Sequence, residues 1–223
     1  MQRRRPSRHA KTVPADLTRA SFILVYQRVT VLLLCGFAVV LVGFAPGHTR
    51  DYTMPSESME PAYSAEEVVT VDLDAYDDAK PAIGDPVVFH PPRGAETEQC
   101  GVPFQPKKPC RVPTPKLSSQ LFLKRIVATP GDRLSIHKGR PVVNGTKVLV
   151  DLIQVCRHFS ACNMKRTITI LPGHYFVMGD NSGASSDSRF WGPVPAGAII
   201  GKVVDGGGGR RPGDLRARGR LGR

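Results

Sequence analysis

Three patterns are missing from this 223-residue sequence, and each absence argues against one class of protein or site. After Pro46 no stretch of ten residues shows a convincing helical period, which disfavours a helical bundle. None of the five cysteines forms a C-x-x-C pair, which argues against zinc knuckles and dithiol redox chemistry. No G-x-S-x-G motif provides a nucleophile-elbow serine, and we interpret the histidines in or beside predicted strands, His90, His137 and His174, as structural.

The excess positive charge lies at the two ends of the chain. Acidic residues number 19 against 31 Lys and Arg, a formal charge of +12. Residues 1–28 hold seven Lys or Arg against one Asp, and residues 205–223 hold six Arg against two Asp, so the middle is nearly neutral. This placement argues against the nucleic-acid partner that the total charge first suggests, and we expect none, although basic arms can also bind nucleic acid. Basic arms beside an apolar run more often face acidic lipid.

One long uncharged run, residues 29–45, predicts a single transmembrane helix. Its length is at the low end for crossing a bilayer, and the apolar residues before it extend it. The cations that precede the run put residues 1–28 in the cytoplasm and everything after residue 46 outside. We expect a single-pass anchor at 29–46, a lipid bilayer as partner and a cell-membrane location. A buried core helix and a cleaved secretory signal are the alternatives.

Four cysteines follow this run, in two closely spaced pairs. In the oxidising compartment predicted above, two structural disulfides are favoured over a four-cysteine zinc site. Four cysteines allow three pairings, of which the two local ones are the simplest, and the sequence leaves the pairing open. The four residues are Cys100, Cys110, Cys156 and Cys162.

Alternating and β-branched segments predict a mainly β domain with antiparallel sheets over residues 47–204. Asn144-Gly145, between two apolar runs, predicts a hairpin. Residues 91–116 hold seven prolines, too many for central strands, and are expected to form an excursion from the sheet. The Gly/Arg-rich tail, 205–223, is expected to be disordered. The predicted strand segments are 68–73, 85–90, 121–128, 133–137, 140–150, 166–170, 174–180 and 198–204.

Two segments carry candidate catalytic chemistry. Ser56 and Ser58 stand one residue apart in the stretch MPSESMEP, and a serine becomes a nucleophile only beside a base. A lysine serves as that base only when burial lowers its pKa from about 10.4. Lys124 lies among apolar residues on a predicted strand, and the two-residue period points it and Arg125 to opposite faces.

A third segment, GDNSGASSDSR at residues 179–189, could support such a lysine. Asp187 and Arg189 are spaced to form an ion pair, and neighbouring serine hydroxyls can hold a neutral amine without adding charge. As an isolated segment it would be interpreted as a polar connecting loop.

Together, four ordered blocks resemble type I signal peptidases, the bacterial membrane-bound serine proteases with a Ser/Lys dyad. The resemblance covers the chain from the predicted anchor to about residue 204. It departs from the family pattern at Pro86, which falls on a family strand, and at the Pro/Cys-rich excursion. The blocks are SESMEP at 56–61, GDPVVF at 84–89, KRIVATPGD at 124–132 and GDNS at 179–182 with SSDSR at 185–189.

This resemblance implies a role for each candidate residue. Ser58 would be the nucleophile and Lys124 the general base. Ser56 would help to hold the oxyanion. The lysine contact is assigned to Ser185 rather than Ser186 by alignment alone. The supporting residues would be Asp187, Arg189 and Arg125.

The implied function is cleavage of signal peptides from exported preproteins, without metal or cofactor. Two alternatives remain open: a conjugation- or pilin-type maturation peptidase of the same superfamily, and a catalytically inactive, membrane-anchored β module that binds a partner. Dyad-containing repressors that cleave themselves would need a DNA-binding N-terminus where this chain has an apolar run. The sequence leaves the oligomeric state undetermined.

Overall fold

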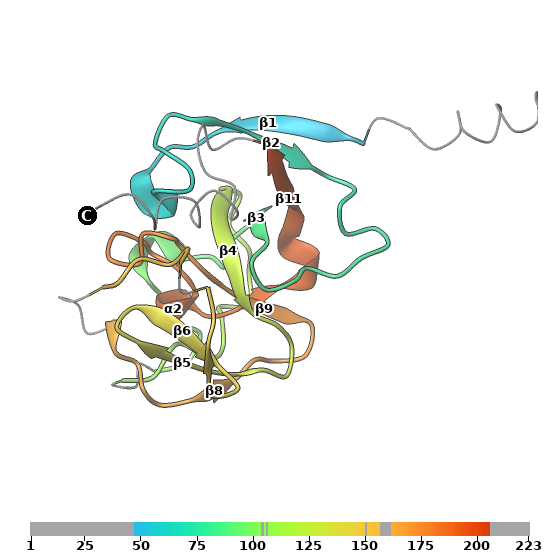
Figure 1. The fold of residues 1–223 in the computed structure, drawn as a ribbon. Helices are drawn as coiled ribbons and strands as arrows, with labels where there is room; N and C mark the ends of the chain where they lie inside the picture. The colour runs from blue at the N-terminus through green and yellow to red at the C-terminus, as the bar shows by residue number, and fades with distance from the viewer. Residues whose placement is uncertain (1–46, 104, 106, 150, 157–161, 206–223) are drawn as a thin grey trace, which may run out of the picture. The chain divides into compact units, whose positions relative to one another are not determined.

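The computed structural model describes residues 47–103, 105, 107–149, 151–156 and 162–205, which form two antiparallel sheets with a few short helices (Figure 1). The larger sheet has the strand order β1-β2-β11-β3-β4-β9-β10. All its neighbouring strands are antiparallel, which confirms the predicted mainly β class. Its strands are β1 (Thr49–Thr53), β2 (Val68–Asp72), β3 (Pro86–Phe89), β4 (Phe122–Ala128), β9 (His174–Met178), β10 (Val194–Pro195) and β11 (Ile199–Asp205).

The smaller sheet has the order β7-β6-β5-β8. Its β6 and β7 form the predicted hairpin, with φ of 51° at Asn144 and 86° at Gly145, as a type I′ turn requires. Its strands are β5 (Arg133–His137), β6 (Arg140–Val143), β7 (Thr146–Lys147) and β8 (Ile168–Thr169). The short helices among the described residues are η1 (Glu57–Met59), η2 (Ala95–Thr97), α2 (Ser188–Trp191) and η4 (Ala196–Ala198).

Every predicted strand segment overlaps an observed strand, whereas β1 and β10 were not predicted. β1 is exposed along nearly all its length and has no alternating apolar pattern to reveal it. β10 has two residues, one of them proline. Pro86 is the first residue of β3, where a missing N–H is tolerated, and it pairs with Arg125 of β4.

The hydrophobic core consists of three clusters. The first joins the two sheets, with Leu134 and Ile136 of β5 packed against Phe176 and Met178 of β9. The second surrounds Trp191 of α2. The third seats Met59 of η1 between β2, β3 and β4, and its buried members are Met54, Met59, Val69, Val71, Val88, Leu123 and Val203. The η1 turn is therefore fixed to the larger sheet by a fully buried side chain.

The cysteines pair locally, Cys100 with Cys110 and Cys156 with Cys162. The first disulfide lies in the proline-rich stretch 91–116, whose described residues hold only the short η2 helix and an isolated bridge from Pro92. The described residues of that stretch therefore lie outside the two sheets.

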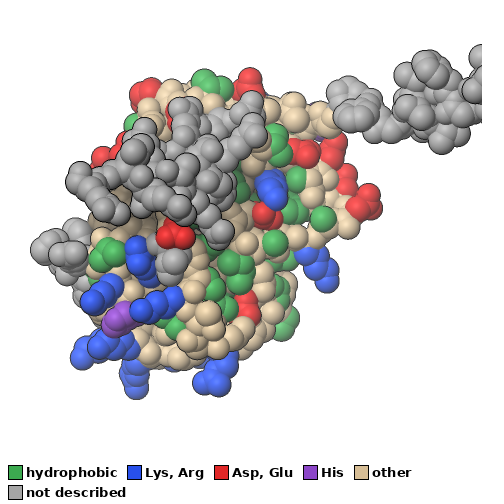
Figure 2. Space-filling model, viewed as in Figure 1, with side chains coloured by type: hydrophobic (Ala, Val, Ile, Leu, Met, Phe, Trp, Pro, Cys, Tyr) green, Lys and Arg blue, Asp and Glu red, His purple; other side chains and the backbone are tan. Residues whose placement is uncertain are grey.

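Charge is unevenly distributed between the two ends of the described structure. Residues 47–99 contain twelve Asp or Glu against three Lys or Arg, whereas the described residues of 107–166 contain twelve Lys or Arg against two Asp. Figure 2 shows the acidic side chains gathered at the end that holds β1 and β2, and the basic ones around β5 and β6. The near-neutral net charge expected for this part of the chain therefore results from an acidic end and a basic end whose charges largely cancel.

The part of the chain that the structure describes contains no helix long and apolar enough to cross a bilayer. The predicted cytoplasmic segment 1–28, the predicted anchor 29–46 and residues 206–223 of the tail all lie outside it.

Candidate active site

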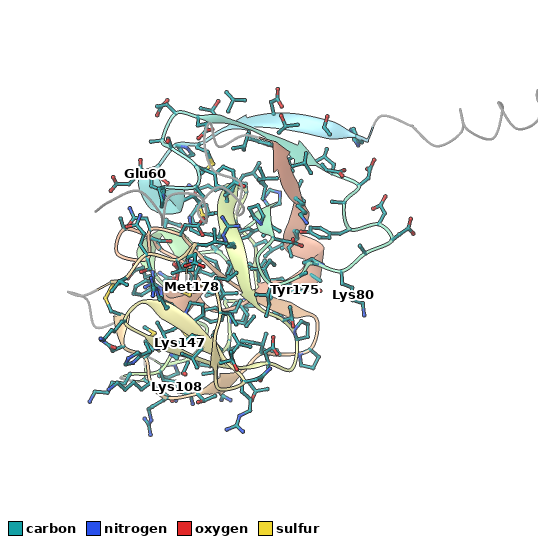
Figure 3. The ribbon with its side chains drawn as sticks, viewed as in Figure 1. Glu60, Lys80, Lys108, Lys147, Tyr175 and Met178 are labelled. Carbon is teal, nitrogen blue, oxygen red and sulfur yellow. A yellow bond between two sulfur atoms is a disulfide. The ribbon has the colours of Figure 1, made fainter. Side chains whose placement is uncertain are left out.

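Ser58 lies in the 3-10 turn η1, directly after β1. Ser56 precedes the turn in extended conformation, and Met59 locks it to the third core cluster. Glu60, labelled in Figure 3, closes the turn through its N–H, which donates to the carbonyl of Glu57. The first N–H groups of a helical turn have no partner within it, so the N–H of Ser58 is available to an incoming oxyanion.

Lys124 lies on β4, between β3 and β9, and is 6% exposed. Its Nζ atom is 2.8 Å from Oγ of Ser58 and 3.1 Å from the carbonyl oxygen of Leu123. The ring of Phe122 lies on another side, with its centroid 5.5 Å from Nζ. The amine thus contacts a hydroxyl, a carbonyl and an aromatic face, and none of these three groups carries a negative charge.

Burial lowers the pKa of Lys124 from 10.5 to about 8, because removing water destabilises the ammonium more than the neutral amine. The carboxylates of Asp187 and Asp180 partly oppose this shift, and the guanidinium of Arg189 adds to it. Near pH 8 about half of the molecules therefore carry a neutral amine beside Ser58. A neutral amine can accept the proton of the hydroxyl.

Ser56 places a second hydroxyl next to the first. Its Oγ lies 3.2 Å from Oγ of Ser58, and its side chain is exposed to the solvent. By rotating, the hydroxyl can exchange this contact for a hydrogen bond to a bound carbonyl oxygen.

Arg125, the next residue on β4, has partners different from those of Lys124. Its Nε donates to Asp180 at 2.7 Å and its Nη1 to the carbonyl of Gly84 at 2.8 Å. Both members of this ion pair are almost fully buried. Asp180 was not among the predicted site residues, although it belongs to the GDNS block. The available signal was its place in that block, at the last position of the predicted strand segment 174–180.

Asp187 and Arg189 form the buried ion pair that their spacing suggested, with Nε and Oδ1 at 2.8 Å. Asp187 also caps α2 and accepts from the N–H of Gly179. Arg189 donates to the carbonyls of Ser182 and Ser185. The pair therefore holds the loop 179–187, which runs from the end of β9 to α2.

Ser185 and Ser186 are clearly distinguished by their surroundings. Oγ of Ser186 donates to the carbonyl of Ala95 at 3.0 Å. Oγ of Ser185 is buried and has no hydrogen-bond partner among the described residues, so it does not bond Lys124 here. A Cβ atom on Gly179 would overlap both Oγ of Ser185 and the carbonyl oxygen of Ser58. Ser185 and the backbone of Ser58 thus both approach Gly179 closely, and only a glycine leaves room for them there.

A cleft of about 580 Å³ opens over the two reactive atoms. A smaller cavity of about 60 Å³ adjoins it, between Met54, Val88 and Leu123. A cavity of about 660 Å³ beside the Cys100–Cys110 disulfide is lined by neither Ser58 nor Lys124. The lining residues of the cleft are Met54, Pro55, Ser56, Ser58, Gln120, Leu121, Phe122, Leu123, Lys124, Ala184 and Ser186.

Comparison with known proteins gives one consistent set of matches. The family model "Signal peptidase, peptidase S26" matches residues 24–205. A signal peptidase I from Leptolyngbya laminosa is 30% identical over 170 residues, which cover 76% of this chain and 74% of the relative. A probable signal peptidase I-1 from Synechocystis is 25% identical, with 80% of each chain covered. A crystal structure of a signal peptidase I from Enterococcus faecalis is 22% identical and covers 56% of this chain and 97% of that one, at a TM-score of 0.40.

Proposed function

The chain belongs to the signal peptidase family, peptidase S26, and is a serine peptidase; from this premise we propose that Ser58 and Lys124 form the dyad with which it cleaves signal peptides from exported preproteins. The observation that carries the proposal is the buried 2.8 Å contact between Nζ of Lys124 and Oγ of Ser58. That distance is within the range for direct proton transfer between a nucleophile and its base.

In the first step, Oγ of Ser58 attacks the carbonyl carbon of the scissile peptide while its proton passes to the neutral amine of Lys124. A C–O bond forms, and the carbonyl oxygen becomes an oxyanion. The N–H of Ser58 and the hydroxyl of Ser56 are positioned to donate to that oxygen. One such donor typically contributes roughly 3–4 kcal/mol to transition-state stability.

In the second step, the C–N bond breaks and the ammonium of Lys124 returns its proton to the leaving amine. The signal peptide remains as an ester on Ser58. A water molecule then attacks this ester, Lys124 takes the water's proton and returns it to Oγ of Ser58, and the signal peptide leaves as a carboxylic acid. Lys124 thus acts as base and acid in turn.

The substrate is expected to bind as an extended strand along β4. Among the described residues, β9 pairs with β4 only from Arg125 onward, opposite Met178. The preceding part of β4 lines the cleft and has a strand neighbour on the β3 side only. A peptide strand can add to such an open edge. The adjoining cavity of about 60 Å³ has room for a small side chain such as alanine near the scissile bond.

Membrane anchoring is also part of the proposal, because the apolar run at 29–46 precedes the catalytic serine closely. Ser58 lies twelve positions after Pro46, an extended reach of about 40 Å. A peptidase tethered in this way, with its N-terminus in the cytoplasm, would meet preproteins whose own apolar segment is still in the bilayer.

The decisive experiment incubates the detergent-solubilised full chain with a preprotein and compares it with Ser58→Ala. The native chain should release the mature protein, and the variant should be slower by about 10³-fold or more. Ser135→Ala, on β5 in the smaller sheet, is the matched control and should cleave normally. Cleavage by Ser58→Ala at the native rate would show that the proposed nucleophile is wrong.

A further inference from the structure

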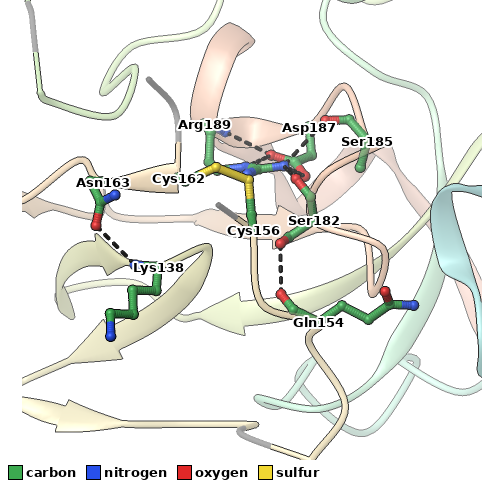
Figure 4. The surroundings of a disulfide bond; sticks show 9 residues. All are labelled: Lys138, Gln154, Cys156, Cys162, Asn163, Ser182, Ser185, Asp187 and Arg189. Carbon is green, nitrogen blue, oxygen red and sulfur yellow. Dashed lines mark hydrogen bonds and ion pairs between the residues drawn. A yellow bond between two sulfur atoms is a disulfide. The ribbon is translucent and has the colours of Figure 1, made fainter. Parts of the chain in front are cut away.

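The segment that leads into the Cys156–Cys162 disulfide contacts the loop 179–187 through Gln154. The N–H of Gln154 donates to the carbonyl of Asp180 at 2.8 Å, and Oγ of Ser182 donates to the carbonyl of Gln154 at 2.7 Å. Figure 4 shows the second of these contacts. The backbone N–H and the backbone carbonyl of Gln154 thus each make one hydrogen bond to the loop 179–187.

The side chain of Gln154 extends in the other direction, to the turn that carries the nucleophile. Its Nε2 donates to the carbonyl of Glu60 at 3.0 Å, and Glu60 is the residue that closes η1. Asn181 joins the same two elements, because its N–H donates to the carbonyl of Ser58 at 3.1 Å. Gln154 and Asn181 are therefore two links between the turn and the loop, and Gln154 comes from a third part of the chain.

The Cys156–Cys162 disulfide begins two residues after Gln154. Cys156 and Cys162 are both buried, and each bonds the turn between β5 and β6. The N–H of Cys156 donates to the carbonyl of Lys138, and the N–H of Gly139 donates to the carbonyl of Cys162. A Cβ atom on Gly139 would overlap both Cys156 and Ser182, so the hairpin turn, the disulfide and the loop are closely packed at this glycine.

We propose that Gln154 is a positioning residue for Ser58, and that the Cys156–Cys162 disulfide keeps Gln154 in place. The inference rests on the proposed function, since it concerns the same serine. Small displacements of a nucleophile lower the rate of attack steeply, because the reacting atoms must meet within a narrow range of distance and angle. Loss of the Glu60 contact would remove one of the constraints that hold the turn relative to Lys124, beside those from Met59 and Asn181. Full activity therefore requires this cysteine pair to be oxidised.

The first test replaces Gln154 by methionine, which keeps the length of the side chain and removes its donor. We expect kcat to fall about three- to tenfold, the effect of one hydrogen bond, with KM and the melting temperature unchanged. Gln105→Met, at an exposed glutamine elsewhere, is the control and should behave as the native chain. An unchanged kcat in Gln154→Met overturns the inference.

The second test is a double-mutant cycle. Gln154→Met is combined with Cys156→Ser/Cys162→Ser and, separately, with Cys100→Ser/Cys110→Ser. If the Cys156–Cys162 disulfide acts through Gln154, the effect of Gln154→Met shrinks below about twofold in the Cys156→Ser/Cys162→Ser background. In the Cys100→Ser/Cys110→Ser background it keeps its full size. Equal effects in both backgrounds overturn the role of the disulfide. If the serine pair does not fold, the apolar pair Cys156→Ala/Cys162→Val replaces it.

Failure of this inference is distinguishable from failure of the proposed function. If the native chain cleaves the preprotein and Ser58→Ala does not, the function stands whatever Gln154→Met does. If Ser58→Ala retains full activity, Ser58 is not the nucleophile. The proposed function and the inference on Gln154 then both fail.

Discussion

Nζ of Lys124 lies 2.8 Å from Oγ of Ser58, although the two residues are 66 positions apart in the sequence. The fold buries both residues where they meet, and this burial lowers the pKa of the lysine to about 8. Fold and reactivity are therefore coupled at this contact, and the predictions below follow from it and from the groups that surround it.

Replacing Lys124 by methionine should abolish cleavage and stabilise the fold. Activity should fall by at least about 10²–10⁴-fold, the usual contribution of a general base. At pH 7 the buried ammonium destabilises the native chain, because its pKa is lower in the folded state than in the unfolded state. The unfolded chain binds more protons between about pH 8 and 10.5, so native stability should rise with pH in that interval.

Urea unfolding of both proteins at pH 7 and pH 10 measures this effect. At pH 7 the free energy of unfolding should be larger for Lys124→Met than for the native chain. This difference should shrink by roughly 2 kcal/mol between pH 7 and pH 10. A difference in free energy of unfolding that stays constant would mean that Lys124 is not desolvated in solution.

The rate of cleavage should follow the protonation of Lys124. Because the base must be neutral, kcat/KM should rise about tenfold per pH unit below pH 8 and level off above it. The measurement is a pH series from 5 to 9 with one preprotein, with circular dichroism at each pH as the control for folding. A flat profile over this range would contradict the assignment of Lys124 as the base.

Breaking the buried pair between Arg125 and Asp180 should destabilise the fold. Asp180→Leu leaves the guanidinium of Arg125 buried without its carboxylate, which typically costs about 3–5 kcal/mol. Adding Arg125→Met should restore a large part of that loss, because no unpaired charge remains. Thermal unfolding of the single and double variants tests this, and a double variant less stable than Asp180→Leu would refute it.

Ser185→Ala should lower activity without lowering stability. Oγ of Ser185 is buried without a partner among the described residues, so its removal breaks no hydrogen bond there. If the hydroxyl orients the amine of Lys124 during the reaction, as the family resemblance implies, kcat should fall about tenfold or more. Parallel kinetics and melting curves separate the two effects. Unchanged kinetics would leave Ser185 with a packing role only.

Several site residues were predicted from local sequence because the chemistry requires particular side chains at short spacing. Asp187 and Arg189 are two residues apart, and an ion pair at that spacing needs only the local capping geometry that the structure has. Asp180 was missed because its partner Arg125 is 55 positions away. Gln154 was missed for the same reason, since nothing in its own sequence indicates that it reaches Glu60.

The sequence by itself determined the mainly β class, the hairpin at Asn144-Gly145 and the short-range pair of Asp187 with Arg189. These depend on alternation, turn preference and spacing, which act over a few residues. Only the tertiary structure decided which carboxylate pairs with Arg125, how the cysteines pair, and that one glutamine connects the nucleophile turn to the loop after β9. Those contacts join distant segments, and the packing of the two sheets against one another selects which segments meet.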